Sequence, residues 1–353
     1  MHKRKRSILS IAFIVLIAVA VIQPVPYVIE TPGPVFNTLG ESNGTPYVDI
    51  SGVKTYPTSG ELNMTTVSIY GGPDKGVDLF QAINAIFPWN ERNHVVPRQV
   101  IFPEDMTASE NAAINASEFS TSQSYAIAAA MKYLHRHVNE QIVVNSVQQG
   151  MPAEKYLEAG DVIVAVDGKK TVTPEQTVNL IRVPPAGRIV KLTILRDAVL
   201  QNYKIKTVPK PGSPKLPYIG IGIDTLYSAD FPIKFGVNDV GGPSAGTMFA
   251  LSIIDQLTPG PLTSGKIIAG TGTIDPDGQV GPIGGIQQKM FAAHDHGAKL
   301  FIAPQDNCDD VVGNTPAGLT VVPVRTLSDA VQVLDDFRVG KPLSACKVTT
   351  TKK

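Results

Sequence analysis

Cysteine and net charge are both scarce in this sequence. Cys308 and Cys346 are the only cysteines among 353 residues, and they have neither CxxC spacing nor a histidine partner for zinc. Two cysteines are too few for a disulfide scaffold, but they allow one disulfide. Lys+Arg 31 and Asp+Glu 31 cancel, which removes the basic surface that nucleic-acid binding requires. We therefore expect no structural zinc and no nucleic-acid partner.

Charged residues are also few, at 18%, while hydrophobic residues make up 43%. This composition excludes a disordered polyelectrolyte and a membrane protein with several spans. At about 150 residues per domain, the length allows roughly two domains. We expect most of the chain to fold as a multidomain α+β globule.

The long apolar run of the chain lies at its N-terminus. Basic residues at 2–6 precede the run Ile8–Ile22, which only Ser10 interrupts. By the positive-inside rule, we expect residues 1–25 to form a cytoplasmic basic stub and a transmembrane signal anchor, and the rest of the chain to lie outside the cytoplasm. The 15 residues of the run extend about 22 Å as a helix, less than a bilayer core of about 30 Å. A cleaved signal peptide and a buried soluble helix therefore stay open as alternatives.

Residues 26–120 form a mixed region to which we assign no role. Strand-like stretches lie at Tyr47–Ile50 and Thr65–Ile69, and Asp78–Ile86 is helix-like.

A β-rich unit is expected at residues 121–208. The blocks Gly150–Ala153, Leu157–Ile163 and Val166–Gly168 resemble the PDZ domains of bacterial proteases. The resemblance implies a groove between a strand and a helix that takes an extended peptide as an added strand. We identify no carboxylate-binding loop in this unit. Its chain leads into a Pro-rich linker at 209–217.

A second domain is expected at residues 218–340, followed by a polar tail at 341–353. Strand-like runs alternate there with helix-like runs, which argues for an α/β or α+β layer structure. The run Met248–Ile254 is apolar nearly all round, so we expect its helix to be buried.

Ser244 stands at the start of that buried helix, within Gly242-Pro243-Ser244-Ala245-Gly246. Small neighbours allow a substrate to approach, and the helix N-terminus favours a developing oxyanion. Taken alone, such a serine is more often only a helix N-cap. A nucleophile needs a base, and none of the six histidines has a spacing that pairs it with Ser244.

Lys289 is the better candidate for the base. On the predicted helix Ile286–His296 its neighbours three and four positions away are Gly285, Ile286, Ala292 and Ala293, so no carboxylate accompanies it. A desolvated lysine loses its proton more easily, which a general base for a serine hydroxyl requires.

These blocks resemble the proteolytic domain of Lon proteases. The resemblance covers residues from about Ile219 to Leu334 and includes Gly242 to Gly246, Thr271-Gly272 and the glycines before Lys289. It implies that Ser244 is the nucleophile and Lys289 the base, that Thr271 orients the lysine, and that Gly242, Ala245 and Gly246 support the site. Together with the anchor and the PDZ-like unit, it is similar to the membrane-associated, ATP-independent Lon-like proteases of Gram-positive bacteria, the YlbL type. It also implies a possible homohexamer ring.

Three other motifs receive no functional role. Gly260–Lys266 imitates a phosphate-binding loop but continues with Ile267, where the hydroxyl that binds Mg²⁺ would stand. Asp275–Gly278 reads as a β-turn, and His294–His296 as a solvated helix end. We predict no cofactor and no metal.

The sequence therefore predicts a membrane-anchored serine endopeptidase with a Ser-Lys dyad. Its substrates would be unfolded or extended extracytoplasmic proteins, recognised by the PDZ-like unit. The rival hypothesis is a non-catalytic membrane scaffold or chaperone that binds protein tails in its PDZ groove.

Overall fold

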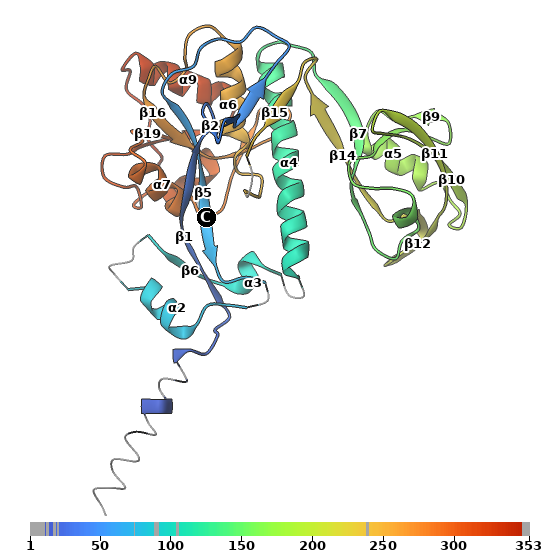
Figure 1. Cartoon of the computed structure of the whole chain (residues 1–353), viewed down its shortest axis with the longest axis horizontal. Helices are drawn as coiled ribbons and strands as arrows, with labels where there is room; N and C mark the ends of the chain where they lie inside the picture. Colours follow the sequence, from blue (N-terminus) through green and yellow to red (C-terminus); the bar gives the residue numbers. More distant parts are fainter. Residues whose placement is uncertain are drawn as a thin grey trace, which may run out of the picture. The chain divides into compact units, whose positions relative to one another are not determined.

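The computed structural model describes residues 11, 14–16, 19, 21–73, 75–87, 92–103, 106–237 and 240–347. They form two compact units, of which one is His135–Pro232 and the other combines the residues before and after it (Figure 1). The predicted basic stub, most of the apolar run and the end of the polar tail lie outside the described residues. Within the described ranges, no helix combines the length and apolar character needed to cross a membrane.

The first unit is built on a mixed sheet with strand order β20-β19-β16-β5-β1-β6. Its strands are β1 (Tyr27–Asn37), β5 (Glu61–Tyr70), β6 (His94–Pro97), β16 (Ile267–Gly270), β19 (Leu300–Pro304) and β20 (Thr320–Val324). β20, β19, β16 and β5 run parallel to one another, whereas β1 runs antiparallel to both β5 and β6. Short ribbons pair β2 (Glu41–Ser42) with β3 (Thr45–Pro46), β4 (Val48–Ile50) with β15 (Ile233–Phe235), and β17 (Thr273–Ile274) with β18 (Val280–Gly281).

Helices cover both faces of this sheet. They are α2 (Leu79–Ala85), α3 (Arg98–Ile101), α4 (Ala108–Tyr133), α6 (Gly246–Leu257), α7 (Ile286–Asp295), α8 (Cys308–Val311) and α9 (Leu327–Arg338), with a 3₁₀ turn η3 (Gln305–Asn307). Ala269 of β16 packs in one core cluster with Ile286 and Met290 of α7. The next residue, Gly270, lies against Met248 of α6. Because adjacent strand residues point to opposite faces, α6 and α7 cover opposite sides of the sheet.

The region 26–120, which had no assigned role, belongs to this same unit. β1 and β5 supply central strands, and α4 packs along α6. α4 begins directly after Thr107, which forms a capping box with Glu110. The boundary between the two units also differs from the expected one, because it lies at 232/233 and not at 218.

The second unit, His135–Pro232, is an antiparallel sheet with strand order β11-β10-β8-β7-β14, and β9 pairs with β8. Its elements are β7 (Asn139–Val147), η2 (Pro152–Lys155), β8 (Val162–Val166), β9 (Lys169–Lys170), α5 (Pro174–Ile181), β10 (Ile189–Arg196), β11 (Val199–Lys206), β12 (Val208–Lys210), β13 (Ser213–Tyr218) and β14 (Ile221–Ser228). Asp167 and Gly168 both have positive φ, and the Thr173 side chain caps α5 by accepting from the Gln176 N–H.

The segment 209–217 differs from the expected linker. It lies within the antiparallel hairpin of β12 and β13, which turns at Gly212 with φ +73°. Both strands of a two-stranded ribbon are edges, so prolines that lack an N–H are tolerated there. β14 then pairs with β7 and completes the sheet of the second unit, although Ile219–Ile223 was expected to open the other domain.

Candidate active site

Ser244 lies in the loop that enters α6, one residue before the N-cap Ala245. Ala245 makes no side-chain cap, and Ser244 does not stand in the N-cap position. The alternative that Ser244 is only an N-cap is therefore wrong. α6 is almost entirely buried and so holds the loop on a rigid element.

Hydrogen bonds fix this loop from two sides. The Ser244 carbonyl oxygen accepts from the Thr271 hydroxyl at 3.0 Å and from the Gly272 N–H at 2.9 Å. The Pro243 carbonyl oxygen accepts from Ser122 Oγ of α4 at 2.9 Å. A Cβ on Gly246 would meet Ile274 Cγ2 at 2.7 Å, so only glycine fits at this turn.

Lys289 reaches this loop from α7, with a side chain that is only 3% exposed. Its Nζ lies 2.6 Å from Ser244 Oγ and donates to Thr271 Oγ1 at 3.1 Å. α7 starts directly after Gly285, whose φ is +65° and whose Cβ would lie 2.6 Å from Val67 Cγ2. This close approach of α7 to β5 is what brings Lys289 to the serine.

Burial lowers the pKa of Lys289 from 10.5 to about 7. In the described part of the chain no carboxylate pairs with its ammonium, so nothing opposes the desolvation. Near neutral pH a large fraction of this side chain is therefore a neutral amine, which can accept the serine proton.

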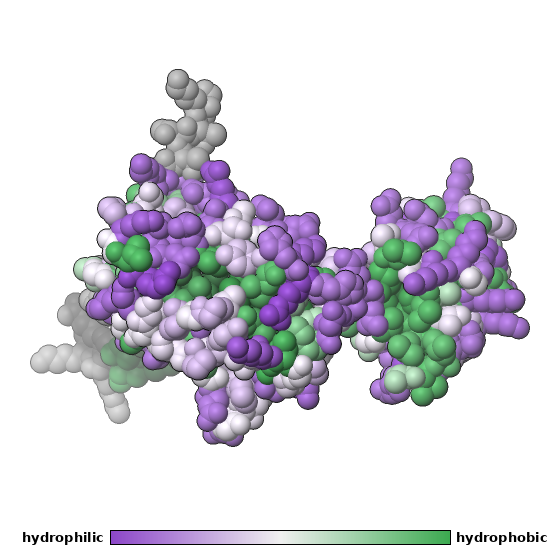
Figure 2. Space-filling view, turned by 90° about the horizontal axis from the view of Figure 1, so that it is seen from above, coloured by the Kyte–Doolittle hydropathy of each residue, from purple (hydrophilic) through white to green (hydrophobic). Residues whose placement is uncertain are grey.

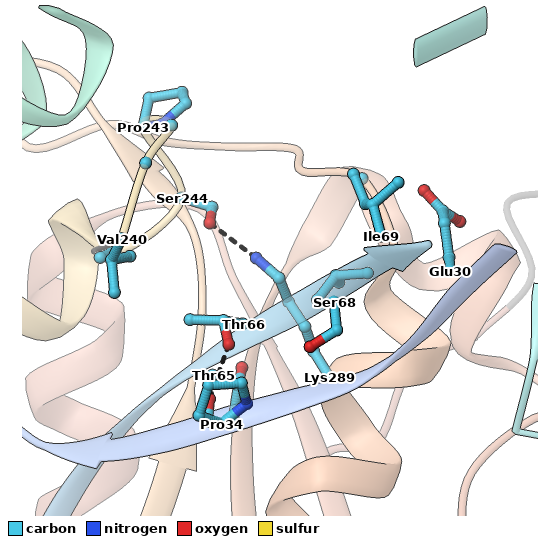
Figure 3. A pocket seen from close by; sticks show the side chains of 15 residues that line it. Glu30, Pro34, Thr65, Thr66, Ser68, Ile69, Val240, Pro243, Ser244 and Lys289 are labelled. Carbon is cyan, nitrogen blue, oxygen red and sulfur yellow. Dashed lines mark hydrogen bonds between the residues drawn. The ribbon is translucent and has the colours of Figure 1, made fainter. Parts of the chain in front are cut away.

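A cavity of about 420 Å³ opens in front of Ser244 and Lys289. Thr65–Ile69 of β5 form one wall and Val240–Ala245 form another, with Glu30 among the remaining lining residues. Figure 3 shows the side chains of Ser244 and Lys289 pointing toward one another in this space.

The wall formed by β5 offers a free strand edge. β16 pairs with β5 only along Glu61–Met64, whereas β1 continues along the other side of β5 to Tyr70. No described strand pairs with the β16-facing edge of Thr65–Tyr70. Backbone groups at such an edge can bind an extended peptide.

The predicted residues Ser244, Lys289 and Thr271 thus meet at one place, and Gly242, Ala245 and Gly246 lie in the same loop. Lys266, the lysine of the motif that resembles a phosphate-binding loop, does not belong to this site. Its Nζ donates to the Phe337 carbonyl oxygen at 3.1 Å. Asp275 forms a turn, in which Oδ1 accepts from the N–H groups of Asp277 and Gln279. Among the described residues, no three or more His, Cys, Asp or Glu side chains are placed to hold a metal ion.

Two features of the site were not predicted from the sequence. The cavity wall on β5 and the support from Ser122 both come from residues 26–134. The capping box at Thr107 is the one local signal that could have extended α4 toward Ser122.

The second unit has an apolar groove between α5 and the start of β14. Its lining includes Val178 and Ile181 from α5 and Ile219, Ile221 and Ile223 from the opposite side. Hydrophobic side chains of this unit reach the surface on the face shown in Figure 2. The resemblance to PDZ domains implied a groove between a strand and a helix, but the strand that lines it, β14, was expected in the other domain.

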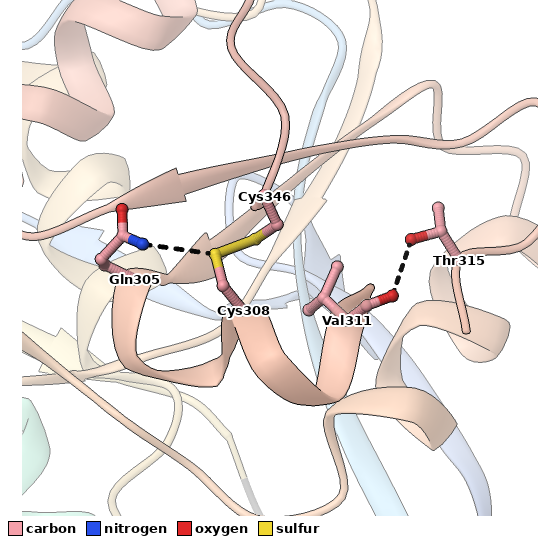
Figure 4. Close-up of a disulfide and its surroundings, with 5 residues drawn as sticks. All are labelled: Gln305, Cys308, Val311, Thr315 and Cys346. Carbon is pink, nitrogen blue, oxygen red and sulfur yellow. Dashed lines mark hydrogen bonds between the residues drawn. A yellow bond between two sulfur atoms is a disulfide. The ribbon is translucent and has the colours of Figure 1, made fainter. Parts of the chain in front are cut away.

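Cys308 and Cys346 form a disulfide, which the sequence left open. Cys308 is fully buried, and Cys346 packs against the core cluster around α7 (Figure 4). The bond ties the C-terminal segment to the layer that carries Lys289.

Comparison with known proteins identifies two domains. Residues 232–335 match the Lon protease (S16) C-terminal proteolytic domain, and residues 120–207 match the PDZ domain. Lon protease of Vibrio parahaemolyticus is 30% identical over 163 residues, which are 44% of this chain and 20% of that protein. Lon protease of Elusimicrobium minutum is 36% identical over 138 residues, 37% of this chain and 16% of that protein. The chain thus spans about a fifth or less of the length of these relatives.

Among solved structures, the PDZ domain of an SdrC-like protein from Listeria monocytogenes is 26% identical, with a TM-score of 0.22. The match covers 24% of this chain and 86% of that one. A solution structure from Geobacillus thermodenitrificans is 36% identical, again with a TM-score of 0.22, and covers 23% of this chain and 94% of that one. The domain matches at residues 232–335 and 120–207 show that the chain carries a Lon-type proteolytic domain and a PDZ domain.

Proposed function

We propose that this protein is a serine endopeptidase in which Lys289 is the general base for Ser244. The observation that carries the proposal is the 2.6 Å distance between Lys289 Nζ and Ser244 Oγ, at a lysine whose pKa burial lowers to about 7. A histidine is then unnecessary, because the neutral amine itself can take the serine proton.

The reaction begins when the neutral Lys289 amine accepts the hydroxyl proton and Ser244 Oγ attacks the peptide carbonyl carbon. The oxyanion that forms is favoured by the N-terminal end of α6, where the helix dipole is positive. The tetrahedral intermediate expels the amine of the leaving segment, which takes the proton from the Lys289 ammonium. Water then attacks the acyl-enzyme, with Lys289 again as the base, and releases the acid and the free serine.

Substrates would bind as an added strand along the free edge of β5. This edge lies on the wall of the cavity that holds Ser244, so an extended backbone there would present its carbonyl groups to the nucleophile. A folded substrate has few such segments, so we infer a preference for unfolded or extended chains. The PDZ groove at α5 and β14 would select or deliver them.

A membrane anchor, extracytoplasmic substrates and cleavage without ATP are further parts of this proposal. They rest on the basic residues 2–6, on the apolar run Ile8–Ile22 and on the resemblance to YlbL-type proteases. The orientation would place the N-terminus in the cytoplasm and the two units outside. A hexameric ring rests on the resemblance alone.

The test is cleavage of casein by the full chain in mild detergent without ATP. The full chain is used because β1 begins at Tyr27 and pairs with β6 from that residue on, so a truncation that removes the N-terminal run together with the first residues of β1 would disrupt the sheet. We expect cleavage that disappears in both Ser244→Ala and Lys289→Ala. Equal cleavage by all three proteins would overturn the dyad. A folded parent without activity would favour the rival function, a non-catalytic PDZ scaffold.

A further inference from the structure

Helix α2 presents its large side chains to solvent and its small ones to the core. Ala82 and Ala85 are buried in a core cluster with Ile29 and Val77. Phe80 is 62% exposed and Ile83 is 42% exposed. A surface helix ordinarily shows the opposite arrangement, with polar side chains outward.

Ile86, the C-cap of α2, extends this apolar face and is 67% exposed. We call Phe80, Ile83 and Ile86 the α2 patch. The segment 79–87 contains no charged residue, so covering the patch buries no charge of its own. Exposed apolar side chains gathered on one element mark an interaction surface.

The α2 patch is held directly beside the end of the apolar N-terminal run. The Leu79 N–H donates to the Gln23 carbonyl oxygen at 3.1 Å, and the Val25 N–H donates to the Val77 carbonyl oxygen at 2.9 Å. An antiparallel bridge joins Pro24 to Asp78 between these two bonds. The start of α2 is therefore fixed to the residue that follows the run Ile8–Ile22.

From this connection we infer that the α2 patch docks into the lipid surface of the membrane that the N-terminal run enters. This inference rests on the proposed membrane anchor. The run has 15 residues, about 22 Å of helix, against a hydrocarbon core of about 30 Å. A span that is too short draws the residues flanking it into the interfacial layer, and α2 is bonded to those residues.

The neighbourhood of the patch suits a lipid surface better than a protein partner. Tyr27 opens β1 at 41% exposure, and Tyr70 ends the adjacent β5 at 59% exposure. Tyrosines favour the membrane interface, where the ring is apolar and the hydroxyl stays hydrated. A lipid surface also accepts exposed apolar side chains without a partner of matching shape, whereas a stable protein interface needs one.

The test uses a fluorescent label at single cysteines in the full chain. The two native cysteines are paired, so an introduced cysteine is the one free thiol. Ile83→Cys and Ile86→Cys place an environment-sensitive nitrobenzoxadiazole label on the patch. Val339→Cys is the matched control, because Val339 is 60% exposed in the same unit and follows α9.

Each labelled protein is reconstituted into vesicles of phosphatidylethanolamine and phosphatidylglycerol, with and without nitroxide-labelled lipid. We expect a blue shift and strong quenching by the nitroxide lipid at positions 83 and 86, and neither at 339. A label at 83 and 86 that stays as exposed to water as at 339 would overturn the inference. A blue shift without lipid quenching would also overturn it and would show that protein covers the patch.

Two further measurements separate this inference from the proposed function. Flotation of the unlabelled full chain with the vesicles tests the anchor, and casein cleavage tests the peptidase. If the chain floats but the labels at positions 83 and 86 stay exposed to water, the inference is wrong, while the proposed anchor and dyad are unaffected. If the chain does not float, both the proposed anchor and the inference are wrong. Casein cleavage then still tests whether Ser244 and Lys289 form a catalytic dyad.

Discussion

The Thr271 hydroxyl donates a hydrogen bond to the Ser244 carbonyl oxygen at 3.0 Å while it accepts one from Lys289 Nζ at 3.1 Å. Thr271 follows β16, so the end of one sheet strand determines where both the serine loop and the lysine head group lie. It is a positioning residue that acts through Ser244 and Lys289.

Replacing Thr271 tests this role. Thr271→Val removes the hydroxyl at nearly constant volume, and we expect kcat to fall roughly 10- to 100-fold with little change in KM. Thr271→Ser keeps the hydroxyl and should restore most of the activity. The valine variant should also shift the acidic limb of the pH profile to lower pH, because the ammonium loses an acceptor. Equal loss in both variants, with an unmoved pH profile, would mean that Thr271 is only structural.

The activity should depend on pH through Lys289. Its pKa of about 7 in the folded protein means that the neutral amine is scarce below pH 7 and predominates above it. We expect kcat/KM to rise with pH by up to about tenfold per unit below the pKa and to level off above pH 8. Steady-state kinetics on a fluorogenic peptide between pH 5 and 9 checks this. A rate that is flat across pH 7 would contradict the lysine as base.

Lys289→Arg tests whether Lys289 acts as a base or only through its positive charge. The guanidinium stays protonated throughout this pH range, so this variant should be inactive at every pH tested. Activity in a folded arginine variant would show that the residue acts only by its positive charge.

The free energy of unfolding should also depend on pH through the titration of Lys289. The folded pKa of Lys289 lies below its unfolded value of 10.5, so between pH 7 and 10.5 the unfolded chain binds more protons. The contribution of Lys289 to stability therefore rises with pH across this window, by at most on the order of 5 kcal/mol. Lys289→Met should be more stable than the parent at pH 7, and this advantage should shrink toward pH 10. Urea unfolding of both proteins at several pH values measures the difference. A difference independent of pH would contradict the lowered pKa.

The core layers around the dyad could be predicted from the sequence, whereas the wall of the cavity that β5 forms could not. The apolar run Met248–Ile254 and the small neighbours of Lys289 are local patterns, and they correctly placed α6, α7 and the buried lysine. The pairing of β5 with β16 joins segments about 200 residues apart, and no local pattern specifies such a partner.

The errors of the sequence interpretation have a similar cause. The prolines near 209–217 lack backbone donors, which is equally consistent with a linker and with the edge strands that form the β12–β13 hairpin. β14 is an apolar strand that either unit could bury, and only its register with β7 decides the matter.

The disulfide should matter for stability and not for chemistry. Cys308 and Cys346 close a loop with a sequence separation of 38, for which loop entropy predicts about 4 kcal/mol of stabilisation. Cys346→Ser should lower the thermal unfolding temperature, as should a reductant added to the parent. Because neither cysteine lines the cavity, kcat at a temperature where the variant is folded should stay unchanged. Loss of kcat in the folded variant would tie the C-terminal segment to the site.

Formation of an acyl-enzyme at Ser244 is the central claim, and its direct measurement is a single-turnover burst. The full chain is mixed with an activated peptide ester, release of the leaving group is followed, and the trapped adduct is located by mass spectrometry. The dyad predicts a burst that approaches one equivalent per active chain, a mass increase on the peptide containing Ser244, and loss of both in Lys289→Met. A burst that persists in Lys289→Met, or an acyl group found on a residue other than Ser244, would contradict the account.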